Sequence, residues 1–209
     1  MKARRLTVLL VAALALGGCS SLNPFGSGNL KIAALKPLNN PVRTTESWRV
    51  RVGEAGVFVL QPAQNSGAVF ATGSDGDVVR IESGRTIWKT RLKTIVSGGI
   101  GIGGNLLVVG TPKGEVIALD ASSGEIKWRV SVNAEVLAPP GVSDGLVVVR
   151  SADSRLFGLD PVDGRRRWVY QRATPSLSLR SSAGVVLESN AILAGFPGGK
   201  LAAISPTNG

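Results

Sequence analysis

All four tryptophans of the chain stand at one interval, Trp48, Trp88, Trp128 and Trp168, each 40 residues after the last. Tryptophan is a rare residue, and a chain that places it only at a fixed period repeats a structural unit. Periods of about 20 to 50 residues are typical of solenoids, propellers and other arrays. The interval therefore constrains the fold more than any local motif does.

Similarity between the repeats extends well beyond the tryptophan. Each repeat has an apolar run, a turn, a second apolar run and then a glycine four residues before the Trp. The second apolar run ends in Glu82 in the first repeat, and in Asp120 and Asp160 in the next two. The glycines are Gly84, Gly124 and Gly164, and a fourth repeat begins at residues 191–195.

These runs predict an all-β fold. They are rich in Val, Ile and Leu and are bounded by Gly, Asp, Ser and Pro, as strands are, and no sustained helical period follows the N-terminal segment. Three to four strands in about 40 residues predict a β-propeller built from four-stranded blades. We expect an incomplete ring of about four blades over 48–209, with repeats at about 53–92, 93–132, 133–172 and 173–209. Trp88, Trp128 and Trp168 would then be packing residues.

Trp48 differs from the others because no earlier strands precede it. Its run, residues 47–52, is predicted to be the final strand of a blade whose other strands lie at the far end of the complete chain, since propellers commonly close in that way. Gly209 stands one short run before the next expected Trp. We therefore expect an open arc in which the Trp48 strand lacks its closing partner.

The first 18 residues have the pattern of an export signal. Basic residues precede an apolar run from Leu6 to Leu16, which is followed by Leu-Gly-Gly-Cys ending at Cys19. The run is too short for a transmembrane helix, and its order is that of a signal peptide. Cys19 is the only cysteine, so it is the predicted lipidation site, where several acyl chains would give a stable anchor. Ser20, rather than Asp, at the next position favours the outer membrane.

Residues 19–47 are predicted to be a lipid-anchored flexible tether, since they are rich in Ser, Asn, Pro and Gly and lack strand patterning. Removal of the signal peptide takes three basic residues and lowers the formal net charge of +10 to about +7. This charge favours an acidic partner or anionic lipid headgroups. A nucleic-acid partner is not expected for an exported protein.

The composition offers little for catalysis. The chain has no histidine, which removes the commonest general base and most zinc and copper sites. Gly-x-Gly-x-x-Gly over 99–104 is followed by a strand and not by a helix, so we expect these glycines to serve a tight inter-strand turn and not a phosphate. The aspartates are spread over turns and form no calcium loop. We therefore predict no catalytic residues, no metal and no cofactor.

One segment departs from the repeat and is the candidate partner-binding site. From Trp168 to the strand residue Ile192 is 24 residues, whereas Trp128 to Val147 is 19. The extra length carries Leu177, Leu179 and Arg180, which would form an apolar anchor with an adjacent charge. Loops on rigid scaffolds often hold function. The alternative is an ordinary strand with both leucines facing the core, and the pattern alone does not choose between them.

The repeat units around Asp120, Gly124 and Trp128 resemble those of quinoprotein-type propellers. With the Leu-Gly-Gly-Cys motif and the run Pro-Ser-Leu-Ser-Leu-Arg over 175–180, the chain resembles the BamB family of outer-membrane assembly lipoproteins along its whole length. The resemblance implies an eight-bladed propeller on the periplasmic face of the outer membrane, without catalytic activity. It also implies that Leu177, Leu179 and Arg180 contact a POTRA domain of BamA within the BAM complex. Ser181 stands where that family usually has Gly.

Two other functions remain open from the sequence. A quinone-dependent dehydrogenase would need a calcium site and catalytic carboxylates at the propeller centre, for which the sequence gives no clear candidates; dye reduction with added quinone and calcium would reveal it. A periplasmic binding module with another partner would be separated from a BamA-binding subunit by crosslinking in cells.

Overall fold

The computed structural model describes residue 36, residues 42–173 and residues 182–209. The chain divides into two units, Met1–Thr45 and Glu46–Gly209. The few described residues of the first unit have no regular structure, so the fold described below is that of the second unit. No helix in the described ranges is long and apolar enough to cross a membrane.

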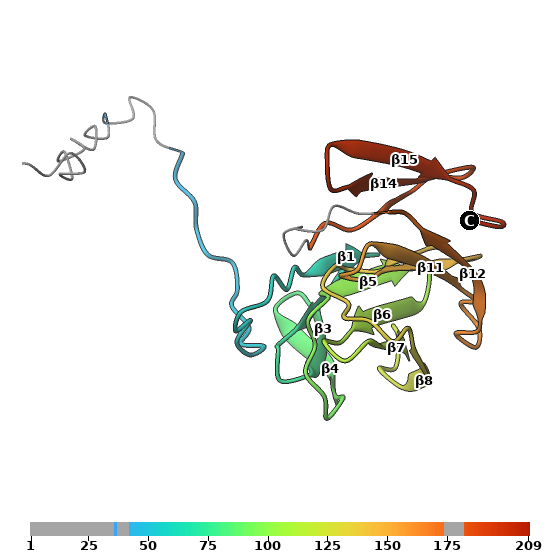
Figure 1. Cartoon of the computed structure of the whole chain (residues 1–209). Helices are drawn as coiled ribbons and strands as arrows, with labels where there is room; N and C mark the ends of the chain where they lie inside the picture. The colour runs from blue at the N-terminus through green and yellow to red at the C-terminus, as the bar shows by residue number, and fades with distance from the viewer. Residues whose placement is uncertain (1–35, 37–41, 174–181) are drawn as a thin grey trace, which may run out of the picture. The chain divides into compact units, whose positions relative to one another are not determined.

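Four antiparallel sheets follow one another along the second unit, and each is formed by strands that are consecutive in sequence (Figure 1). We call them blades 1 to 4. Blade 1 comprises β1 (Ala63–Asn65), β2 (Ala68–Thr72), β3 (Asp77–Glu82) and β4 (Arg85–Arg91). Blade 2 comprises β5 (Ile100–Gly103), β6 (Leu106–Gly110), β7 (Glu115–Asp120) and β8 (Ile126–Ser131). Blade 3 comprises β9 (Gly141–Val142), β10 (Val147–Arg150), β11 (Arg155–Leu159) and β12 (Arg166–Gln171). Blade 4 has three strands in the described ranges: β13 (Val186–Leu187), β14 (Ile192–Phe196) and β15 (Lys200–Ile204).

The middle strands are apolar throughout because both of their faces are covered. All five residues of β6 are buried. Leu107 and Val109 of this strand pack into a core cluster with blade 1, whereas Leu106 and Val108 pack into a second cluster with blade 3. A third cluster joins blades 3 and 4. A strand covered on both faces needs a continuous apolar run, which explains why these segments do not alternate.

The fourth strands show the opposite pattern, with the repeat tryptophan buried among exposed neighbours. In β8 and β12, Trp128 and Trp168 are buried while the residues on either side are exposed. Each tryptophan strand has a register irregularity opposite the third strand, and in all three blades it falls just after the residue paired with the Trp. Bulges increase local twist, so the same twist is built into each blade at the same place.

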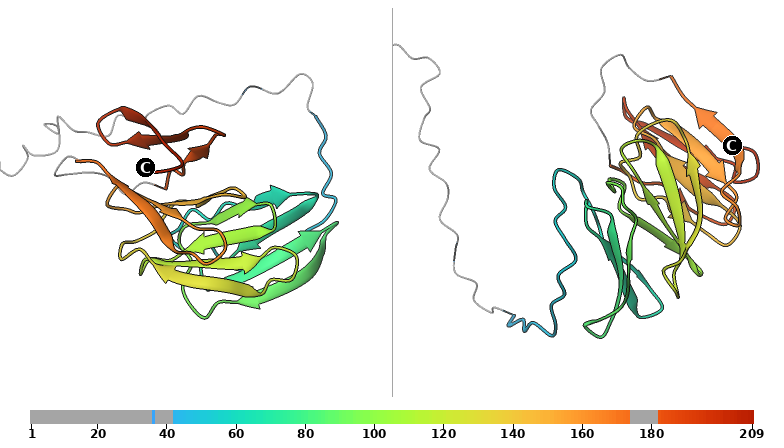
Figure 2. Two further views of the ribbon diagram at one scale, coloured as in Figure 1. Left: turned by 90° about the vertical axis from the view of Figure 1, so that its right-hand side faces the viewer. Right: turned by 90° about the horizontal axis from the view of Figure 1, so that it is seen from below.

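Blades stack through their first strands. β5 contacts both β1 and β9, and β9 contacts β13, so the four sheets lie one after another in chain order (Figure 2). Gly101 and Gly103 of β5 permit this approach: a Cβ on Gly101 would stand 2.1 Å from the carbonyl oxygen of Pro140, and one on Gly103 would stand 2.4 Å from that of Val142.

The structure corrects two sequence predictions and confirms the all-β prediction. No strand forms over 47–52: within the described residues the first strand is β1, and none of the four sheets pairs with that run. A lone extended segment has no hydrogen-bonding neighbour to hold it as a strand. The glycines of 99–104 do more than form a turn. Gly104 does lie in the β5–β6 turn with φ of 53°, but Gly101 and Gly103 lie within the strand and serve the inter-blade contact.

Candidate functional site

The residues predicted to act directly fall outside the part of the chain that the structure describes. These are the lipidation site Cys19 and the partner-binding residues Leu177, Leu179 and Arg180. The structure does describe both ends of the segment that carries the last three. The described chain continues from β12 of blade 3 to Ala173, and it resumes at Ser182, ahead of β13 of blade 4. The segment therefore connects blade 3 to blade 4 in sequence.

A buried arginine contacts the chain close to where the described residues resume at Ser182. Arg150, the last residue of β10, is 5% exposed. Its Nη1 donates a hydrogen bond to the carbonyl oxygen of Ala183 at 3.3 Å, and its guanidinium carbon lies 5.3 Å from the ring centroid of Phe196. The Phe196 ring is in turn 5.8 Å from that of Tyr170. Burial lowers the pKa of Arg150, and the aromatic face partly offsets the loss of hydration.

Arg150 is not among the residues that the sequence predicts to be functional. The signal is present in the repeat: the residue 40 positions earlier is Gly110, at the same place in the second strand of blade 2. A long cation in the place of this glycine marks a local difference in packing between blades 2 and 3.

The repeat tryptophans join each blade to the next. The indole N–H of Trp88 donates to the carbonyl oxygen of Ala121 at 3.1 Å, that of Trp128 to Pro161 at 3.0 Å, and that of Trp168 to Pro206 at 2.9 Å. Each acceptor lies in the last turn of the following blade. These contacts give the tryptophans a packing role between blades.

Glycines of the same turns lie under the indole rings. A Cβ on Gly124 would come 2.7 Å from Trp88, and one on Gly164 would come 2.7 Å from Trp128. A Cβ on Gly84 would likewise lie 2.7 Å from the Cβ of Trp48. Trp48 thus contacts blade 1 as the other tryptophans contact blades 2 to 4, although its run is not a strand and the residue is 46% exposed.

The predicted turn aspartates organise those turns. Oδ1 of Asp120 accepts hydrogen bonds from the backbone N–H groups of Ser122 and Ser123 at 2.9 and 3.1 Å. Oδ1 of Asp160 accepts one from Val162 at 2.9 Å. The hydrogen bond from the Ser122 hydroxyl holds the pKa of Asp120 well below its usual range, and the hydrogen bond from the Arg167 guanidinium lowers the pKa of Asp160. Both carboxylates are therefore ionised turn formers.

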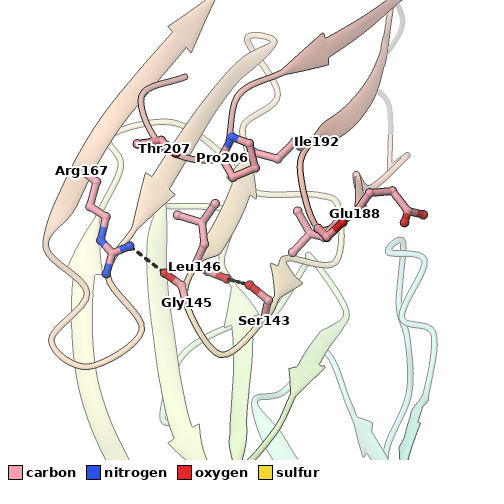
Figure 3. A pocket seen from close by; sticks show the side chains of 10 residues that line it. Ser143, Gly145, Leu146, Arg167, Glu188, Ile192, Pro206 and Thr207 are labelled. Atoms are coloured by element: carbon pink, nitrogen blue, oxygen red, sulfur yellow. Dashed lines mark hydrogen bonds between the residues drawn. The ribbon is translucent and has the colours of Figure 1, made fainter.

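A pocket of about 500 Å³ lies between blades 3 and 4 (Figure 3). Arg167 stands on its wall, and its guanidinium is committed to the protein: Nη1 donates to the Gly145 carbonyl at 2.7 Å and Nη2 to Oδ2 of Asp160 at 2.8 Å. A smaller pocket of about 260 Å³ occupies the same place between blades 2 and 3, with Lys127 in the place of Arg167. A cavity that recurs with the blades and uses its cation internally is a packing feature.

Within the described residues no cluster of three or more His, Cys, Asp and Glu side chains could hold a metal ion. The ionised aspartates with lowered pKa values are bonded to their own turns, so they are poor candidates for general bases.

Comparison with protein families gives one match that covers most of the blades. The matching family is described as outer membrane protein assembly factor BamB, and the match spans residues 74–209.

Curated relatives extend the similarity along the chain. Outer membrane protein assembly factor BamB of Nitrosomonas eutropha is 39% identical over 227 residues, and that of Bordetella pertussis is 38% identical over 210 residues. These alignments cover 99% and 100% of this chain and 54% of each relative. The chain thus spans about half the length of the curated relatives it matches.

Solved structures agree with the sequence matches. BamB from Moraxella catarrhalis is similar with a TM-score of 0.68 and 31% identity, over 72% of this chain and 46% of that one. This likeness confirms the predicted fold class of propeller blades. A quinohemoprotein alcohol dehydrogenase from Pseudomonas putida has a TM-score of 0.61 at 16% identity, over 78% of this chain and 34% of that one, and shows the fold alone.

Proposed function

The chain belongs to the BamB family of outer membrane protein assembly factors, and on that premise we propose that the protein is a non-catalytic subunit of the outer-membrane β-barrel assembly (BAM) complex. The observation that carries the proposal is the family match over residues 74–209, which covers the chain from just before β3 of blade 1 to the last described residue of blade 4. In this role the propeller is a scaffold that aids insertion of outer-membrane proteins. The absence of histidine from the sequence supports a role without acid–base chemistry.

The proposed location is the periplasmic face of the outer membrane, reached through a lipid on Cys19. Residues 1–18 would be removed as a signal peptide, and residues 19–47 would tether the lipid to the folded body. The composition of these two segments supports the proposal.

Replacement of the proposed lipidation site, Cys19→Ser, should release the protein from membranes. We expect most of the protein to move from the membrane fraction to the soluble periplasmic fraction, since acyl chains on Cys19 supply the stable anchor. Cell fractionation and mass spectrometry of the N-terminal peptide measure this. Ser20→Ala keeps the thiol and should remain with membranes. A Cys19→Ser protein that stays in the membrane fraction would contradict the anchor.

The proposed partner is BamA, bound through a POTRA domain, with Leu177, Leu179 and Arg180 as contacts. Two leucines next to an arginine provide an apolar anchor and a directional charge, which is the composition of an interface hot spot. The described structure supports this choice because it fixes the two ends of the segment to rigid blades. Binding residues often lie on connecting segments that the surrounding fold holds in place.

Truncation of these contacts tests the function. Each of Leu177→Ala, Leu179→Ala and Arg180→Ala should weaken capture of purified BamA periplasmic domains by about five- to thirtyfold, as expected for loss of roughly 1–2 kcal/mol. Titration by biolayer interferometry gives the affinities. Val162→Ala, at an 82% exposed position in a different turn, is the matched control and should bind as wild type. If the variant with all three substitutions captured BamA as well as wild type, these residues would not be the binding site. Crosslinking in cells would then be used to identify another partner.

A further inference from the structure

One position of the third strand has the same place in every blade but a different exposure in the last. It is the second residue of that strand, which pairs with a residue near the end of the second strand, and it is Val78, Val116, Leu156 and Leu201 in blades 1 to 4. The first three are 0% exposed and lie in the core clusters that join their blade to the next one. Leu201 is 73% exposed. Blade 4 therefore has the apolar face of a blade that packs against a neighbour, and no described residue covers Leu201 in that way.

Blade 4 also has a free strand edge. In blades 1 to 3 the third strand pairs with the fourth strand as well as with the second. Within the described strands β15 pairs with β14 alone, so one row of its backbone N–H and C=O groups has no strand beside it. Such an edge is a template for pairing with another chain.

The face of blade 1 that points away from blade 2 is open as well. Val69 and Ala71 of β2 stand at the positions of Leu107 and Val109 in β6, as their pairing with the third strand shows. Leu107 and Val109 are 0% exposed because blade 1 covers them. Val69 and Ala71 are only half-buried. The two ends of the described unit are thus the two halves of a junction between blades.

The run 47–52 stands in the place of a fourth strand of a blade that would precede blade 1. The tryptophans of β4, β8 and β12 each cover a glycine in the last turn of the following blade, and Trp48 covers Gly84 of blade 1 in the same way. None of the four described sheets pairs with this run. The run is therefore a fourth strand without a third strand, whereas β15 is a third strand without a fourth.

We propose that two copies of this chain complete each other. The run 47–52 of one copy is the fourth strand of blade 4 in the other copy, and the exposed face of that blade 4 packs on blade 1 of the first copy. Each copy gives one strand and receives one, as two-fold symmetry requires. Two copies with four blades each supply eight blades, at the upper end of the usual range of about four to eight, whereas three copies would exceed it. This pairing goes beyond the proposed function and does not depend on BamA.

The repeat predicts the register of the shared sheet. In blades 1 to 3 the tryptophan lies opposite the fourth residue of the third strand. In β15 this residue is Ala203, so Ala203 would lie opposite Trp48 of the other copy. Because the strands of each blade are antiparallel, Ala202 would then lie opposite Arg49.

The oligomeric state tests the pairing, measured by light scattering during gel filtration of the Cys19→Ser protein, which carries no lipid. We expect the mass of two copies for this protein and for a control with Val162→Asp, at an 82% exposed position in a turn of blade 3. Leu201→Asp should give the mass of one copy with an unchanged circular dichroism spectrum, because a carboxylate is tolerated on the open face but not buried against blade 1. A single-copy mass for the parent protein at every concentration, or a two-copy mass for Leu201→Asp, would overturn the proposal.

A designed disulfide tests the register. Opposite residues of an antiparallel pair have Cα atoms about 4.5–5.5 Å apart, which a disulfide can span. Arg49→Cys with Ala202→Cys in the Cys19→Ser protein should therefore give a covalent dimer on a non-reducing gel after mild oxidation. Arg43→Cys with Ala202→Cys is the control and should not cross-link. A single-chain band for the first variant would rule out the strand exchange, whether its thiols remain free or form a disulfide within one chain.

A charge reversal gives an independent readout of the same register. Lys200 would lie opposite Arg51, and like charges directly opposite each other weaken a strand pair. Arg51→Glu should therefore lower the dissociation constant of the dimer at least about twofold. Arg43→Glu makes the same change of charge outside the run and should leave the constant unchanged. Equal constants for the two variants would contradict the proposed register.

Discussion

Replacing Trp128 with alanine should lower the free energy of unfolding by about 3–5 kcal/mol. The indole is buried in the cluster between blades 2 and 3, covers the Gly164 turn and donates to the Pro161 carbonyl. Its removal opens a cavity because the glycine turn and the bulged strand beside it cannot collapse inward. Thermal and urea unfolding followed by circular dichroism give the change.

Two matched variants identify the cause. Trp128→Phe keeps most of the apolar area but leaves the Pro161 carbonyl without its donor, so it should cost about 1–2 kcal/mol. Trp48→Ala removes the same side chain from the equivalent seat over Gly84, where the residue is 46% exposed, and should cost less than Trp128→Ala. If Trp128→Ala destabilised the protein no more than Trp48→Ala, the tryptophan would not be the joint between blades.

The periodic part of the structure could be predicted from sequence. Apolar runs bounded by turn residues predict β6 (Leu106–Gly110) and β7 (Glu115–Asp120), and the structure shows these strands with continuous buried runs. The turns at Asp120 and Asp160 could also be predicted, because the aspartate side chain bonds to backbone groups only a few residues away. Such features depend on neighbours in sequence, so one chain is enough to predict them.

Features that depend on neighbours in space could not be predicted in the same way. Gly101 looks like a turn residue in a glycine-rich run, and only the approach of Pro140 from the next blade reveals its role. The run at Trp48 has the alternation of a strand, but a strand also needs a pairing partner, and the four described sheets do not supply one. Arg150 is a strand residue like its neighbours in sequence, and only the structure shows that it is buried against Phe196 of the next blade.

Gly101→Ala is therefore the sharpest test of how the blades stack. A Cβ at this position would stand 2.1 Å from the carbonyl oxygen of Pro140 and 2.9 Å from its carbon. Both are backbone atoms of Pro140, which immediately precedes β9 of blade 3. Neither atom can rotate away, so the two blades must separate locally. We expect a loss of about 3 kcal/mol or more in the free energy of unfolding, at the upper end for overpacking.

Gly195→Ala supplies the matched control, because it is the same substitution in a strand with nothing within 4 Å of the added methyl group. Alanine reduces the freedom of the unfolded chain, so this variant should be neutral or slightly more stable than wild type. The difference between the two variants isolates the contact between β5 and the Pro140 segment from any general cost of replacing glycine in a strand. Equal melting temperatures would mean that the blades can move apart by the width of a methyl group without loss. The close approach at Gly101 would then not be what holds blade 2 to blade 3, and their shared apolar core and the Trp128 contact would account for it.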